Sequence, residues 1–192
     1  MRHADSHRML RRGNLYARLP DFELHLVPKE HSVEVIGLLC DHAQVSGGKL
    51  FVSGAAISRI TSAPVDPPFR VNVALAVVVT IPWTATNQAH ELTIELVSET
   101  SEGNDRIPLA QGLPPGANPS NEGKIIAQFN AGRAPEMHPG EDSLMPIALP
   151  LPGFPLPRPG DYFFEIEVDG SKAARVSFAL RVLNPAFGPF GT

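Results

Sequence analysis

The residues with the clearest chemical potential are Asp41, His42 and His90. Two imidazoles and a carboxylate are the ligand types of a zinc or non-haem iron centre. However, 47 residues lie between His42 and His90, whereas metal ligands are commonly clustered at short spacings. Neighbouring strand residues point to opposite faces, so Asp41 and His42 act together only if the chain bends there. We therefore expect Asp41 and His42 to form hydrogen bonds with the Ser46–Lys49 turn, and a small enzyme or metal-binding site remains the alternative.

Trp83, Asn87 and His90 form a second candidate group because their spacing corresponds to successive turns of a helix. On one helical face, an aromatic ring beside an amide and an imidazole could stack on a sugar or a base. Such a turn more often packs its aromatic residue over the open end of a sandwich. We favour that structural interpretation, and a carbohydrate-binding module that uses Trp83 remains an alternative.

The remaining reactive residues form no coherent catalytic group. Glu95, Glu165 and Glu167 could pair as the acid and base of a glycosidase, but their alternation with apolar residues indicates solvent-facing strand positions. Cys40 lies in an apolar run and is expected to be a small buried residue. The chain has no Gly-x-Ser-x-Gly elbow and no glycine-rich phosphate loop. The sequence thus predicts no catalytic residue, no metal ligand and no cofactor, and leans against an enzyme.

The charge is distributed unevenly along the 192 residues. Five arginines and one aspartate give residues 1–20 a net charge of +4, which leaves −8 for the rest of a chain whose net charge is −4. An acidic body is a poor match for a phosphate backbone, so we expect no nucleic-acid binding through the domain. The longest apolar run, Val73–Ile81, is far shorter than the roughly 20 residues of a membrane helix, so no membrane span is expected.

The N-terminal sequence does not resemble an export signal, because charged or polar residues interrupt its apolar positions. The interrupting residues are Arg18, Asp21, Glu23 and His25. The single cysteine excludes an internal disulfide framework and agrees with a reducing compartment. We therefore expect a cytoplasmic protein.

Period-two alternation dominates from residue 33 onward and predicts β-strands. The clearest example is residues 71–79, where four valines and a leucine share one face. Gly47-Gly48 and Asp169-Gly170 predict tight hairpin turns between strand-like runs. Ser143–Leu151 is expected to be an edge strand, because its prolines cannot donate ladder hydrogen bonds. The fold class predicted is all-β, an antiparallel immunoglobulin-like two-sheet β-sandwich of about eight strands.

Three segments carry a family resemblance: VIGLLCDHAQVSGGKLFVSGAAISRI, IPWTATNQAHELTIELV and PGDYFFEIEVDG. Together they resemble an uncharacterised bacterial family of small β-sandwich proteins, a domain of unknown function, over about residues 33–183. The resemblance implies a fold and a core boundary, and it implies no activity. The expected organisation is a basic, flexible N-terminal extension at residues 1–30, a β-sandwich domain at 33–183 and a loose C-terminal tail at 184–192.

The apolar strand faces and the lack of a coherent catalytic group favour a non-catalytic β-sandwich that acts as a binding or assembly module. We expect its partner to be a second copy of the chain or another protein. The two alternatives are the site near Asp41, His42 and His90 and the carbohydrate-binding module described above.

Overall fold

The computed structural model describes residues 32–109, 118–119 and 123–183, and its regular structure is β-strand apart from one 3-10 turn, η1 (Trp83–Ala85). The all-β class predicted from the sequence is therefore confirmed. The strands of the described residues are β1 (Glu34–Cys40), β2 (His42–Ser46), β3 (Lys49–Ser53), β4 (Arg59–Ser62), β5 (Phe69–Ile81), β6 (Ala89–Thr100), β7 (Gly103–Ile107), β8 (Asn118–Pro119), β9 (Ile125–Asn130), β10 (Ser143–Leu156), β11 (Gly160–Val168) and β12 (Ser171–Val182).

These twelve strands exceed the eight expected, for physical reasons that the sequence pattern hides. A bend at Asp41 divides one apolar run into β1 and β2. The short strands β4, β7 and β8 have no sustained alternation of polar and apolar residues. Their extended backbone is stabilised by pairing with longer neighbouring strands. The predicted N-terminal extension and C-terminal tail lie outside the described residues. No helix in the described part of the chain is long and apolar enough to cross a membrane.

A three-stranded sheet has the order β1-β5-β10, with both outer strands antiparallel to β5. Alternate β5 side chains from Val71 to Ile81 are buried on one face of this sheet, as the alternation predicts. β10 lies at an edge of the sheet, which confirms the edge strand expected from its prolines. A register shift between Leu151 and Phe154 accommodates the extra residues of β10.

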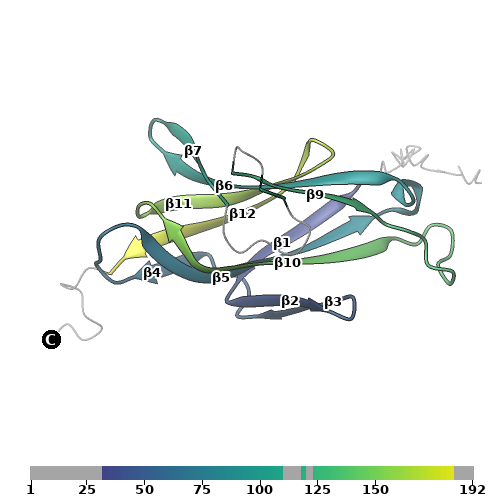
Figure 1. Ribbon diagram of the computed structural model, residues 1–192, viewed down its shortest axis with the longest axis horizontal. Helices are drawn as coiled ribbons and strands as arrows, with labels where there is room; N and C mark the ends of the chain where they lie inside the picture. The colour runs from purple at the N-terminus through teal and green to yellow at the C-terminus, as the bar shows by residue number, and fades with distance from the viewer. Residues whose placement is uncertain (1–31, 110–117, 120–122, 184–192) are drawn as a thin grey trace, which may run out of the picture. The chain divides into compact units, whose positions relative to one another are not determined.

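A seven-stranded sheet has the order β4-β12-β11-β6-β9-β8, and β7 pairs with the second half of β6. β4 is parallel to β12, whereas the other pairs are antiparallel. One core cluster contains buried side chains from both sheets, including Leu75, Leu149, Ile94 and Phe164. Figure 1 shows β6, β9, β11 and β12 of the seven-stranded sheet above β5 and β10.

The β2–β3 hairpin lies against the other face of the three-stranded sheet (Figure 1). Its contact is a small second cluster in which Ala43 of the hairpin packs with Cys40, Ala74 and Ala76. The turn at Gly47 and Gly48 has φ values of 55° and 71°, so both residues adopt the left-handed conformation that the Gly-Gly pair predicts. The hairpin therefore covers part of an apolar sheet face with small side chains.

Tyr162 lies at the start of β11, directly after the segment that connects this strand to β10. Its ring is buried and stacks on Phe178, with centroids 5.5 Å apart. Its hydroxyl donates a 2.5 Å hydrogen bond to the carbonyl oxygen of Arg158, four residues upstream. This contact fixes the chain as it enters β11.

Candidate functional site

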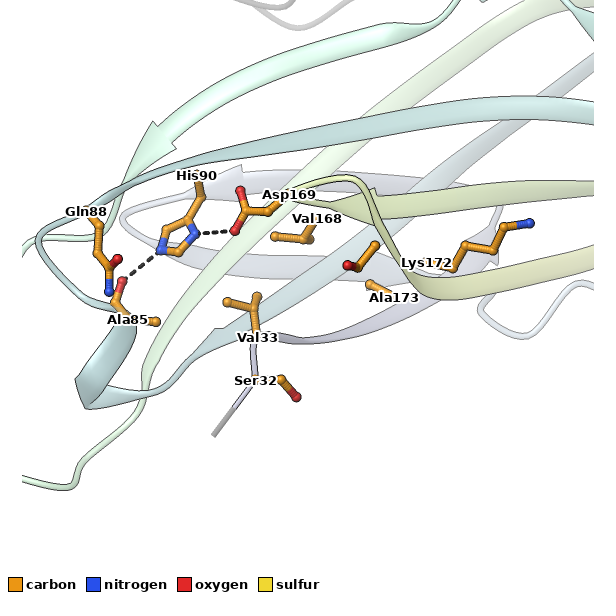
Figure 2. A pocket seen from close by; sticks show the side chains of 10 residues that line it. Ser32, Val33, Ala85, Gln88, His90, Val168, Asp169, Lys172 and Ala173 are labelled. Carbon is orange, nitrogen blue, oxygen red and sulfur yellow. Dashed lines mark hydrogen bonds and ion pairs between the residues drawn. The ribbon is translucent and has the colours of Figure 1, made fainter. Parts of the chain in front are cut away.

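A pocket of about 430 Å³ lies where η1, the start of β6 and the β11–β12 turn meet the start of β1. Figure 2 shows His90 and Asp169 pointing toward each other in it, with Val33 and Lys172 also lining the wall. The turn is the predicted Asp-Gly pair, because Asp169 and Gly170 have φ values of 52° and 74°. This turn geometry brings the Asp169 carboxylate to β6.

His90 is 6% exposed and both of its ring nitrogens have partners. Nδ1 lies 2.8 Å from Oδ2 of Asp169, and Nε2 lies 2.7 Å from the carbonyl oxygen of Ala85. Both partners are acceptors, so two hydrogen bonds require a proton on each nitrogen. The arrangement therefore selects the imidazolium form of His90.

The pKa values of the pair agree with this assignment. Burial lowers the pKa of His90, but the Ala85 carbonyl and the Asp169 carboxylate together outweigh it, and the net pKa is raised. The hydrogen bond from His90 lowers the pKa of Asp169, and the backbone N–H of Glu91, 2.9 Å from Oδ1, adds to that effect against a smaller desolvation cost. His90 consequently has no free lone pair with which to bind a metal ion or accept a proton, and it joins three segments of the chain.

Asp41 and His42 are not part of this pocket. Val33 lines it just before β1, whereas Asp41 follows the other end of that strand. Eight residues of extended chain span about 26 Å, so Asp41 and His42 do not form one site with His90. In the described residues, no three His, Cys, Asp or Glu side chains gather closely enough to hold a metal ion.

The expected contact of Asp41 and His42 with the Ser46–Lys49 turn is wrong. The backbone N–H of Asp41 donates to the carbonyls of Ser53 and Gly54, at 3.1 and 3.3 Å. His42 pairs with Ser53, so both residues lie at the base of the hairpin rather than at its tip. The cause is the bend after β1, which starts the hairpin at His42.

Trp83, Asn87 and His90 do not share a helical face. η1 ends at Ala85, Asn87 has a φ of 62° in the loop that follows, and His90 lies in β6. The guanidinium of Arg133 lies 4.0 Å from the Trp83 ring centroid, and Arg133 also donates hydrogen bonds to Oγ1 of Thr86 at 2.6 Å and to the Trp83 carbonyl at 3.1 Å. One face of the ring is therefore occupied by a side chain 50 residues away, which no sequence signal indicated.

A second pocket, of about 380 Å³, lies on the outer face of the seven-stranded sheet beside β7. Glu95 lines it and is buried, which corrects the expectation that this carboxylate faces solvent. It lies opposite Glu165 in the β6–β11 register. Arg106 and Lys124 form ion pairs with Glu95 at 2.7 and 2.6 Å, because β7 brings Arg106 over β6. Lys172 similarly pairs with Glu165 at 2.5 Å, so the two carboxylates are held by cations.

The outer apolar face is the part of the three-stranded sheet that the hairpin leaves uncovered. It consists of Ile36, Leu38, Val78, Leu144 and Pro146. Ile36 is 63% exposed, Leu38 40% and Leu144 65%. The hairpin adds the exposed side chains of Val45, Phe51 and Val52 nearby. Of the eight large exposed apolar side chains in the described residues, three thus lie on this sheet face and three on the hairpin that packs against the same sheet, and concentrations of this kind mark interaction sites.

Comparison with known proteins places the chain in a family. A family model matches residues 35–181, and the chain belongs to that family, described as "Family of unknown function (DUF6941)". No curated protein matches the chain. Among solved structures, the chain is similar to Pseudomonas fluorescens alkylpurine DNA glycosylase AlkC bound to DNA containing an abasic-site analogue, at 12% identity and a TM-score of 0.34. That similarity covers 78% of this chain and 30% of the glycosylase chain.

Proposed function

We propose that the protein is a non-catalytic β-sandwich module that self-associates through the outer apolar face. The observation that carries the proposal is the exposure of Ile36 and Leu38 on β1 and of Leu144 on β10, on the same face of one sheet. Burying apolar surface contributes about 25 cal/mol per Å², so a partner that covers these side chains gains a hydrophobic driving force. A second copy is the simplest partner because it carries the same uncharged surface.

The groups that could have performed chemistry support a structural role instead. Both nitrogens of His90 are engaged by Asp169 and Ala85. Arg133 lies over one face of the Trp83 ring, which is then closed to a stacking sugar. The buried carboxylate of Glu95 has two cationic partners. Each group is committed to holding the fold, which favours a binding role over catalysis.

We further propose that the sandwich is immunoglobulin-like. In that fold, strands B and E are neighbours in one sheet, and strands G, F and C are consecutive in the other. The orders β5-β10 and β12-β11-β6 match these relations. The hydrogen bond from Tyr162, at the start of β11, to the Arg158 carbonyl matches the tyrosine corner found at the start of strand F. The remaining strands are additions to this framework.

Two further features belong to the proposal. The net charge of −8 outside residues 1–20 supports a protein partner rather than nucleic acid at the domain. The single cysteine, which is buried and free, supports a cytoplasmic location.

The test is a charge placed in the outer apolar face. We expect Ile36→Lys to shift the wild-type assembly toward monomer in sedimentation velocity, because the lysine must be desolvated at the interface. Val65→Lys is the matched control, since Val65 is a 53% exposed apolar residue in the loop before β5. Equal effects of the two variants, or a wild-type protein that is monomeric at every concentration, would overturn the proposal.

A further inference from the structure

The two edges of the three-stranded sheet differ in their ability to accept another strand. Leu39 directs its carbonyl away from β5, because that carbonyl accepts the Ile57 N–H at 3.0 Å. Leu75, its register partner, must then bond to Leu149 of β10 on the other side. Alternation along β10 places the nitrogens of Pro146 and Pro150 on the outer edge. Proline has no N–H to donate, so that edge cannot form a regular ladder.

The β1 edge has no such protection. The same alternation directs the backbone N–H and C=O groups of Val35 and Gly37 away from β5. β1 contains no proline, and within the described residues no strand pairs with its outer side. From Leu39 onward the crossing segment at Ile57 occupies the edge, so the open part is the first half of the strand.

We propose that the β1 strands of two copies pair antiparallel about a two-fold axis at Ile36, which joins the two three-stranded sheets into one six-stranded sheet. The inference rests on the proposed self-association and places its contact at the β1 edge of the outer apolar face, where Ile36 and Leu38 lie and from which Leu144 is distant. Val35 of each copy then forms the hydrogen-bonded pair with Gly37 of the other. Ile36 faces itself in the closer, non-hydrogen-bonded pair, so the most exposed apolar side chain of β1 becomes a cross-strand apolar contact.

The low charge of the surface around β1 favours a second copy as the occupant. A two-fold interface brings every group near its own image, so a surface with many like charges repels itself. The neighbouring part of the outer face comprises alternate residues of β1, of β5 from Ala74 to Thr80 and of β10 from Leu144 to Pro150. Glu34 is the only charged residue among these positions. A second copy can therefore approach without an accumulation of like charge.

The small area of this contact predicts a weak dimer that dissociates on dilution. A stable dimer buries about 800 Å² on each partner, which one short pair of strand edges does not supply. Pairing at β1 leaves most of each outer apolar face, including Leu144, exposed to solvent. Ile36 and Leu38 then lie at the junction of the two copies, where their burial adds to the backbone hydrogen bonds.

Disulfide trapping tests this geometry. In the proposed pair, the Cα atoms of the two Ile36 residues are about 4.5 Å apart, within the roughly 4.4–6.8 Å that a disulfide spans. We therefore expect Ile36→Cys, at micromolar concentration in a glutathione redox buffer, to convert most of the chain to a species of twice the mass on a non-reducing gel. Leu144→Cys is the matched control: its two copies would be five strand spacings, or about 24 Å, apart and should remain uncrosslinked. The parent chain, whose only cysteine is buried, is the blank.

Light scattering on the parent chain separates the possible failures. A dimeric parent in which Ile36→Cys crosslinks no more than Leu144→Cys would overturn β1 pairing and leave self-association intact. A parent that is monomeric at all concentrations would overturn both. Selective crosslinking of Ile36→Cys, with a dimeric parent, supports both.

Discussion

His90 and Asp169 form a hydrogen-bonded ion pair, with Nδ1 and Oδ2 2.8 Å apart, that joins the start of β6 to the β11–β12 turn. The two residues are 79 positions apart in the sequence. The same carboxylate accepts the Glu91 N–H, and the same imidazole reaches Ala85. The pair therefore links three segments of the chain, and its contribution to stability depends on the protonation of both residues.

The His90–Asp169 ion pair predicts a specific pH dependence of stability. The raised pKa of His90 means that its contribution is complete below about 6.5, its usual value, and is lost as the pH rises through the folded-state pKa. The lowered pKa of Asp169 means that its contribution is present above about 3.9 and is lost as the pH falls through the folded-state value. Asp169→Asn should lower the free energy of unfolding by about 1 kcal/mol near pH 5.5, a modest effect because the carboxylate is half exposed.

Urea denaturation of both proteins at several pH values measures the difference, which should shrink as the pH rises above the His90 pKa. Asparagine tolerates the positive φ of Asp169, so the turn itself is retained. A difference that is constant from pH 5 to pH 9 would show that the substitution acts through the turn and not through the ion pair.

Tyr162→Phe should destabilise the protein by about 1–2 kcal/mol, because it removes the hydroxyl that donates the hydrogen bond to the Arg158 carbonyl. The ring and its stacking on Phe178 remain. Asp105→Ala is the control: it keeps the Arg158 carbonyl as the acceptor and removes the exposed ion pair between Asp105 and Arg158, so it should cost less. Guanidinium denaturation ranks the two variants, and the reverse order would contradict the role assigned to the hydroxyl.

At Gly37, β1 and β12 lie too close together to leave room for a side chain. A Cβ at this position would lie 2.6 Å from Cγ2 of Val176. Gly37→Ala should therefore cost about 1–3 kcal/mol through overpacking. The variant that combines Gly37→Ala with Val176→Ala should lose less stability than the sum of the two single losses, which a double-mutant cycle of unfolding free energies would detect. A double variant less stable than Gly37→Ala alone by the full cost of Val176→Ala would indicate that the two residues do not interact.

Gly48→Val should loosen the β2–β3 hairpin, because valine at a φ of 71° carries a strain of roughly 1–2 kcal/mol. The hairpin covers Cys40, so the rate of thiol labelling at this single cysteine reports hairpin opening. We expect about tenfold faster labelling, the equivalent of roughly 1.4 kcal/mol. Gly48→Asn, which adopts this conformation more readily, should change the rate little. Unchanged labelling of Gly48→Val would show that the turn is not under this constraint.

Local patterns predicted the parts of the fold that depend on neighbouring residues. The alternation at Val71–Ile81 predicted β5, and the Gly47-Gly48 and Asp169-Gly170 pairs predicted turns that have the expected positive φ values. The prolines of Ser143–Leu151 predicted an edge strand. Each signal reflects a backbone requirement that is satisfied within a few residues.

Features created by tertiary contacts could not be read in the same way. The burial of Glu95 depends on Arg106 and Lys124 reaching it from β7 and from the segment before β9. His90 was identified as a candidate from its type, but its partner Asp169 lies in a distant turn. The separation of Asp41 from His90 follows from the length of β1, which a list of chemically capable residues does not reveal.

The most direct test of self-association is the mass of the wild-type protein, measured by light scattering during gel filtration over a hundredfold range of micromolar concentrations. The chain mass is 20.7 kDa. The proposed β1-paired assembly predicts twice that mass at the upper concentrations, with a decrease toward one chain on dilution. A mass of one chain at every concentration would contradict the account and leave a different protein or a small ligand as the partner of the outer apolar face.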